Sequence, residues 1–197
     1  MTWNLWRKKP SKRKSLALPA RVDVGLKQIG QEVLRIHESA EFSAQAQFEQ
    51  AKIWRTLNYW LGVPAAVAAT LAGSAILSSG DDWNINGVSG SVIGGGLALF
   101  SAALSATLTT VNATRRMTQT QSSGNAYLQL QTEARQLAMI DLAKYNYDQA
   151  RQAVDGITNS RDELNKTADV PSQLAKRRAR KNLYKEGGQD YAVDQEA

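Results

Sequence analysis

Hydrophobic and polar positions divide this chain into an apolar centre between two polar flanks. Residues 56–80 and 83–114 contain no Asp, Glu, Lys, Arg or His, and only Asp81 and Asp82 separate the two stretches. Each stretch can supply the ~20 apolar residues that a helix needs to cross a bilayer core. The pattern predicts transmembrane helices at 56–80 and 88–114, which the short outer turn 81–87 makes antiparallel neighbours.

The flanks predict long helices on one side of the membrane. Residues 20–55 are expected to form a cytoplasmic helix with the stripe Val22, Leu26, Ile29, Val33, Ile36 and Ala40. Residues 115–170 are expected to begin with a soft connector at 118–125, which is rich in Thr, Ser and Gln. A second helix then follows, with the stripe Leu137, Ile140, Ala143, Tyr147, Ala150, Val154 and Ile157. The two stripes could pair within one chain or between subunits.

These elements predict an all-α membrane protein. Its fold class is an antiparallel two-helix transmembrane hairpin with long N- and C-terminal cytoplasmic helices, assembled as a homo-oligomer. Lys52 and Arg55 precede the first span, Arg115 and Arg116 follow the second, and the turn between the spans has no Lys or Arg. The positive-inside rule therefore places both termini in the cytoplasm. We expect the protein in the inner (plasma) membrane.

The formal net charge of +6 is concentrated in two basic clusters near the chain ends. We expect residues 1–19 to form a disordered basic arm and residues 171–197 a basic, mostly disordered tail. Such clusters bind the lipid bilayer through anionic headgroups, although an acidic partner or RNA would also attract them. No aromatic residues interleave the second cluster, so we do not expect nucleic-acid binding. The candidate lipid- or partner-facing residues are Lys12, Arg13, Lys14, Arg177, Arg178 and Arg180.

Small residues recur along both predicted spans. This spacing lets helix backbones approach closely where lipid offers no hydrophobic drive. The two small faces could pack the spans together, or one of them could pack subunits. The candidate helix-packing residues are Gly62, Ala66, Ala69 and Gly73 in the first span and Gly90, Gly94, Ala98, Ala102 and Ala106 in the second.

A polar stripe on the second span is the candidate pore lining. Ser101, Ser105, Thr109 and Asn112 share one helix face, at spacings of four, four and three residues. Hydroxyl groups can also bond to the carbonyl four residues earlier in their own helix, which explains them without any pore. Because the predicted spans contain no charged residue, a pore here would be weakly selective.

The sequence carries no sign of catalysis. It contains no cysteine, and the single histidine, His37, has no second imidazole to share a metal ion with. The run Gly94–Gly96 is not a phosphate-binding loop, because no Lys-Ser or Lys-Thr pair follows it. We expect no enzyme activity, no metal and no cofactor.

Arg55, Leu57, Tyr59–Ala65, Gly73 and the pair Arg115–Arg116 together resemble the SLATT-type two-transmembrane family, and the resemblance covers residues 22–165. It implies a membrane effector of a prokaryotic anti-phage (conflict) system, which forms a pore that kills or arrests the infected cell. The trigger would be a separate sensor or signalling protein. The alternatives are a membrane-anchored scaffold whose cytoplasmic helices dock a partner, and a holin-like lysis protein.

Overall fold

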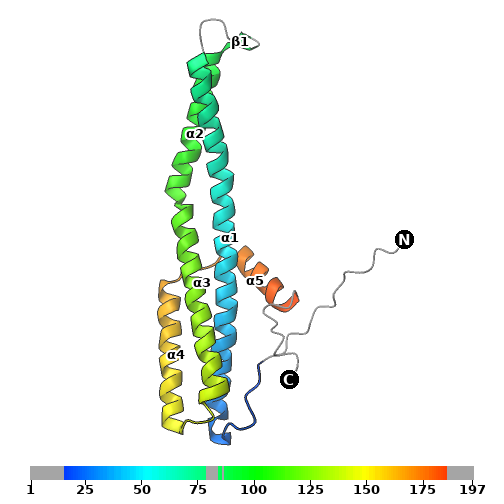
Figure 1. The fold of residues 1–197 in the computed structure, drawn as a ribbon, viewed down its shortest axis with the longest axis vertical. Coiled ribbons are helices and arrows are strands. Elements are labelled where there is room, and N and C mark those ends of the chain that lie inside the picture. Colours follow the sequence, from blue (N-terminus) through cyan, green and yellow to red (C-terminus); the bar gives the residue numbers. More distant parts are fainter. Residues whose placement is uncertain (1–15, 79–83, 86, 186–197) are drawn as a thin grey trace, which may run out of the picture. The chain divides into compact units, whose positions relative to one another are not determined.

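The computed structural model describes residues 16–78, 84–85 and 87–185 (Figure 1). In these residues, the regular secondary structure is helical apart from a short antiparallel ladder between β1 (Asn84–Ile85) and β2 (Val88–Ser89). A 3₁₀ turn, Val24–Leu26, precedes α1 (Lys27–Ser78), which continues through Pro64. The later helical elements are α2 (Gly90–Val111), α3 (Ala113–Gln136), a π-helical turn (Leu137–Asp141), α4 (Tyr147–Thr167) and α5 (Gln173–Lys185).

These elements form two compact units. Unit 1 comprises Met1–Gln50 and Gln119–Ala197, and unit 2 comprises Ala51–Thr118. The helices α1 and α3 each contribute residues to both units.

Unit 1 is built around a core shared by α1, α3 and α4 (Figure 1). Val33 and Ile36 of α1 are fully buried and pack with Leu130 and Ala134 of α3 and Val154 of α4. The predicted stripe of the first flank is confirmed, because its members from Val22 to Ala40 are buried or partly buried. The stripes of the two flanks therefore pair within one chain.

Residues 118–125 are helical within α3, where the sequence predicted a soft connector. Thr120 is fully buried, and Gly124 lies so close to Phe48 that an added Cβ would come within 2.9 Å of the ring. Small side chains at this four-residue spacing let α3 approach α1 closely. This packing outweighs the weak helix propensity of Thr, Ser and Gly.

The second predicted stripe is wrong at Ile140 and Tyr147, which are 49% and 60% exposed. The chain does not form one helix here, because a π-helical turn and residues 142–146 separate α3 from α4. The Arg21 guanidinium donates to the Met139 carbonyl at 3.0 Å, within this irregular segment. A capping box then restarts the helix, in which the Asn146 side chain accepts from Gln149 N and the Gln149 side chain accepts from Asn146 N.

The predicted terminal segments are more ordered than expected where the structure describes them. Leu18, in the predicted arm, packs against the core beside Gly30. Residues 173–185 of the predicted disordered tail form α5, because Ala175, Ala179 and Leu183 give that helix a buried face. Lys12, Arg13 and Lys14 lie outside the described residues, as does the end of the tail.

Candidate functional site

Unit 2 is an antiparallel pair formed by the second half of α1 and by α2, and its contact face is made of small residues. Four alanines of α1 are buried at spacings of three or four residues, and on α2 the buried residues are Gly90, Gly94 and Ser101. Small residues at this spacing allow two helix backbones to come close together. The buried alanines are Ala65, Ala68, Ala72 and Ala75.

A hydrogen bond joins the two helices at one end of this face, between its first alanine on α1 and its last residue on α2. The Ser101 hydroxyl, on a side chain that is only 7% exposed, donates to the Ala65 carbonyl at 2.8 Å. Ser101 thus lies in the contact between the two helices, where its hydroxyl forms a hydrogen bond with α1. A lumen-facing role stays a prediction for the remaining members of the polar stripe, Ser105, Thr109 and Asn112, which are exposed.

The predicted small-residue faces divide into two groups. Gly90 and Gly94 are buried, and a Cβ added at Gly62 would lie 3.8 Å from the Leu108 side chain. The others point away from the contact between the two helices, so within the chain a neighbouring register of small residues packs the pair. Their role in helix packing stays a prediction about contacts with other subunits. These exposed residues are Ala66, Ala69, Gly73, Ala98, Ala102 and Ala106.

The second helix of the pair breaks at Asn112, where the sequence predicted a span continuing to residue 114. Asn112 has φ 50° and ψ 47°, and it is the one non-glycine residue with a positive φ among the described residues. Its N–H bonds the Leu108 carbonyl at 3.0 Å, and its own carbonyl accepts from Arg116 N at 3.1 Å. Asparagine tolerates the left-handed region better than most residues, which explains how the chain passes from α2 to α3.

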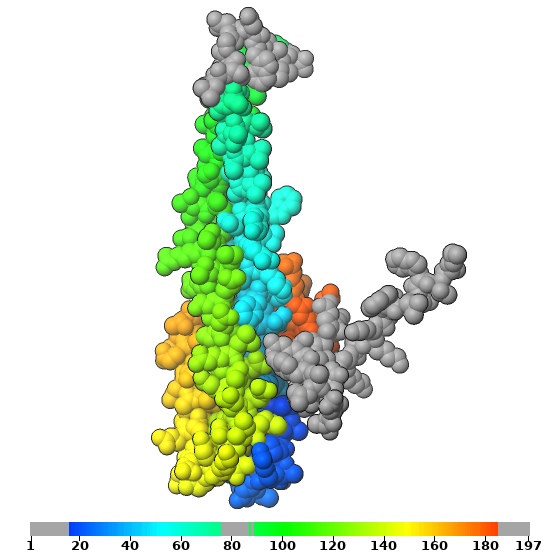
Figure 2. Space-filling model, in the orientation of Figure 1, coloured from blue at the N-terminus to red at the C-terminus, as the bar shows by residue number. Residues whose placement is uncertain are grey.

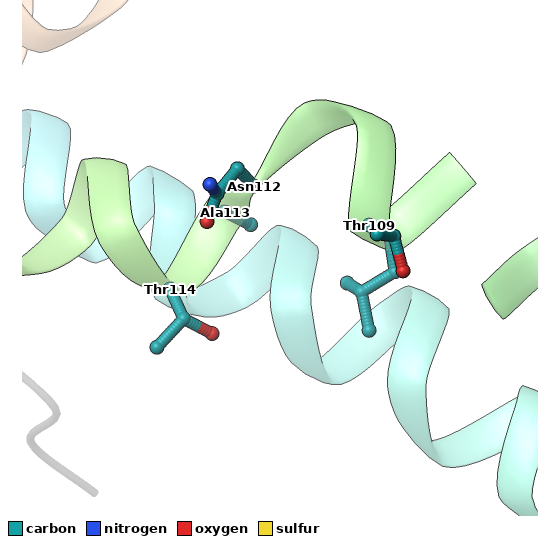
Figure 3. Close-up of a pocket in the computed structure, with 5 residues that line it drawn as sticks. Thr109, Asn112, Ala113 and Thr114 are labelled. Atoms are coloured by element: carbon teal, nitrogen blue, oxygen red, sulfur yellow. The ribbon is translucent and has the colours of Figure 1, made fainter. Parts of the chain in front are cut away.

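A polar hollow of about 270 Å³ lies at this break (Figure 3). Leu108, Thr109, Asn112, Ala113 and Thr114 line it, so the structure brings together the last two residues of the predicted pore-lining stripe. Ser101 and Ser105 are not part of its lining. The Thr109 hydroxyl donates to the Ser105 carbonyl at 2.9 Å, which satisfies it within its own helix.

Polar side chains tie α1 to the start of α3 beside the break. The Thr114 hydroxyl donates to Asn58 Oδ1 at 3.4 Å, and the Arg116 guanidinium lies over the Trp54 ring, 5.4 Å from its centroid. The sequence did not predict that Asn58 and Thr114 are hydrogen-bond partners. The isolated amide of Asn58 inside an uncharged stretch was the available signal, since polar groups in such segments usually find partners.

The outer surface of the helix pair carries many exposed apolar side chains. In Figure 2, where colour follows the sequence, this pair is the cyan and green column. Large hydrophobic side chains of both helices are more than half exposed: Tyr59, Trp60, Val63, Val67, Leu71, Val92, Leu99 and Phe100. Within the described residues, one helical stretch, Gly90–Asp141, is long and apolar enough to cross a membrane. The mean hydropathy of its most apolar window is 1.6, and 11% of that window is buried.

Residues 56–75 and 87–114 of this pair carry no acidic, basic or imidazole side chain that could transfer protons or hold a metal ion. In the part of the chain that the structure describes, no three His, Cys, Asp or Glu residues are grouped as a metal site would require. Comparison with protein-family models, with curated proteins and with solved structures finds no match to this chain. The function therefore has to be inferred from the geometry and surface chemistry of each unit.

Proposed function

We propose that this protein is a membrane effector of a prokaryotic anti-phage (conflict) system, which oligomerises into a pore in the inner membrane when a separate sensor triggers it. Unit 2 inserts as a transmembrane hairpin, and both chain termini stay in the cytoplasm. Lys52, Arg55, Arg115 and Arg116 at the open end of the hairpin favour this orientation.

The observation that carries the proposal is the exposed apolar surface of unit 2. Leu99 is 75% exposed and Trp60 is 74% exposed, and they lie on the two different helices of the pair. A contiguous apolar surface of this kind marks a contact with a membrane or with another protein. A helix in the core of a water-soluble protein would be mostly buried, whereas the most apolar window of Gly90–Asp141 is only 11% buried. Lipid would cover the exposed apolar side chains of both helices at the same time.

Oligomerisation uses the small residues that the hairpin itself does not bury. Ala66, Ala69 and Gly73 form such a face on α1, and Ala98 and Ala102 belong to a second face on α2. In lipid, faces of this kind associate through close van der Waals packing. Two helices enclose no pathway by themselves, so a pore needs several copies of the hairpin.

In the assembled pore, the stripe Ser105, Thr109 and Asn112 faces the lumen. These side chains are exposed, and the stripe contains no charge, so the pore passes ions with weak selectivity. The hollow at Asn112 lies at the cytoplasmic end of this stripe in the proposed orientation. Unit 1 holds the pore closed until the sensor binds.

The test is membrane depolarisation in a bacterial host, followed with a voltage-sensitive dye after induced expression. We compare Thr109→Leu with Thr107→Leu. Both threonines are exposed, and the hydroxyl of each bonds the carbonyl four residues earlier, at 2.9 Å for Thr109 and 2.8 Å for Thr107. Two residues along a helix, however, place them on nearly opposite faces.

At matched and high expression, which is expected to open a fraction of the pores even without the sensor, wild type and Thr107→Leu should depolarise the cells, and Thr109→Leu should do so much more slowly. Equal depolarisation by the two variants would remove the lumen assignment. Cells that keep their potential with abundant wild-type protein in the membrane would leave either a pore that stays closed without its sensor or the second candidate function.

The second candidate is a membrane-anchored scaffold, and it is favoured by the self-contained core of unit 1. Val33, Ile36, Leu130, Ala134 and Val154 are buried together without any residue of unit 2. In this case an unrelated transmembrane hairpin that replaces residues 51–118 would keep the biological activity. The pore proposal expects that replacement to abolish activity.

A further inference from the structure

The helix α5 is amphipathic and basic, and its apolar face is buried. Ala175 and Ala179 are fully buried and Leu183 is 3% exposed, so residues four apart hold one side of the helix against the rest of unit 1. This burial fixes which side of α5 faces outward.

Polar bonds fix α5 and the segment before it to a single stretch of α1. Gln47, Glu49 and Gln50 are each less than 10% exposed, although all three are polar. Their partners lie in residues 169–182. The Gln47 amide donates to the Asp169 carbonyl at 2.8 Å, the Gln50 side-chain oxygen accepts from Ser172 N at 2.9 Å, and the Asn182 amide donates to Glu49 Oε1 at 3.0 Å.

The outward side of α5 is a dense positive surface. Arg177, Arg178, Arg180 and Lys181 are exposed, and the sequence of α5 contains no acidic residue. Leu174 lies on this helix as well and is 50% exposed. Exposed cations with an apolar side chain among them are typical of helices that lie on a membrane surface.

We propose that the outward face of α5 binds the anionic phospholipid headgroups of the cytoplasmic leaflet, an inference that rests on the proposed insertion of unit 2. The positive charge of this face supports lipid as the occupant, and so do the residues that follow Gln47, Glu49 and Gln50 in the sequence of α1. Along α1, Trp54 follows Gln50 by about one turn, and Lys52 and Arg55 accompany it, as residues at a membrane interface do.

The experiment uses the full chain in nanodiscs of phosphatidylcholine, with or without phosphatidylglycerol. The chain has no native cysteine, so an environment-sensitive dye can be attached at Leu174→Cys alone. Lipids carrying a nitroxide on the headgroup quench the dye if α5 lies on the surface. In a second sample, a dye at Leu99→Cys, on the exposed surface of α2, reports the insertion of unit 2 through nitroxides placed within the acyl chains.

We expect quenching at residue 174 that requires phosphatidylglycerol and disappears in 0.5 M salt, since each cation near an anionic surface strengthens binding about five-fold. Reversing Arg177, Arg178 and Arg180 to Glu should abolish the quenching, and Arg178→Gln alone should lower the equilibrium constant for binding the surface about five-fold. The matched control reverses Lys27, Arg135 and Lys144, which are exposed elsewhere on unit 1. It carries the same change in net charge and should leave the quenching intact.

Quenching at residue 174 that is equal in both lipid mixtures, or absent from both, would overturn the binding of anionic headgroups. A dye response that needs added RNA or an acidic polypeptide, and not anionic lipid, would overturn it in favour of that partner. If the dye at residue 99 is quenched while the dye at residue 174 is indifferent to lipid charge, this inference fails and the proposed insertion stands. If the dye at residue 99 is not quenched, the proposed function fails as well.

Discussion

The hydrogen bond between Ser101 and Ala65 allows a direct test of how the two helices of unit 2 pair. The Ser101 hydroxyl donates to the Ala65 carbonyl at 2.8 Å, in a contact otherwise made of small apolar residues. Ser101→Ala removes the bond and little volume. Hydrogen bonds between helices in lipid contribute about 0.6 kcal/mol on average and at most about 1.7 kcal/mol, so we expect a loss of about 1 kcal/mol.

Ser101→Leu adds an overpacking cost to the lost bond. The side chain at position 101 is 7% exposed and lies against buried Ala65, so a leucine has no room unless the helices separate. Overpacking typically costs about 1–3 kcal/mol, which gives a total of about 2–4 kcal/mol. Ser105→Leu is the matched control, because Ser105 is exposed one turn later on the same helix. We expect it to change the pairing free energy by less than about 0.5 kcal/mol.

The assay titrates the purified protein in mild detergent with a denaturing detergent and follows energy transfer between dyes at Tyr59→Cys and Thr110→Cys. Both positions are exposed, one on each helix, and the chain has no other cysteine. The signal therefore reports separation of the pair and not the unfolding of unit 1. Equal midpoints for Ser101→Leu and Ser105→Leu would refute the assignment of Ser101 to the helix contact.

Three further predictions concern single residues. Gly124→Ala should lower the free energy of unfolding by about 1 kcal/mol, because the clash with Phe48 outweighs the gain in helix propensity. Gly156→Ala should raise the free energy of unfolding by about 1 kcal/mol, because an added Cβ meets nothing within 4 Å there. Asn112→Ala should cost about 1 kcal/mol in the dye assay and Asn112→Gly should not, because φ is 50° at that position; equal effects would contradict the left-handed break. Burial raises the pKa of Tyr127, so the unfolded chain loses this proton first and stability should fall as pH rises above about 10, up to the higher folded-state pKa. Thermal unfolding against pH should show a smaller alkaline loss for Tyr127→Phe, which also loses the 2.8 Å hydrogen bond to Asn165.

The core of unit 1 could be predicted where one side of a helix is clearly apolar. Val33 and Ile36 stand out from polar neighbours, and both are fully buried. The prediction failed at Ile140 and Tyr147, because spacing alone does not reveal a π-helical turn followed by a capping box at Asn146. It also failed at residues 118–125, which are helical in spite of weak helix propensity, with Thr120 buried and Gly124 packed closely against Phe48 of α1.

The sequence could not predict which face of each helix packs in unit 2, and the reason here is different. The first span offers small residues on more than one face, so Ala66 and Ala69 look as suitable for packing as Ala65 and Ala68. The faces differ by one residue, or about 100° around the helix. Only the partner helix selects between them, through contacts such as the bond from Ser101 to the Ala65 carbonyl.

The connection between α4 and α5 shows how the fold constrains its own variation. Gln47 and Gln50 bond the backbone of Asp169 and Ser172, and Val170 between them is 84% exposed. Main-chain groups are present whatever the side chain, so substitutions at residue 170 should be nearly neutral. Inserting one residue there would instead move the backbone groups away from the two glutamines. In related sequences, this segment would be free to change in composition while keeping its length.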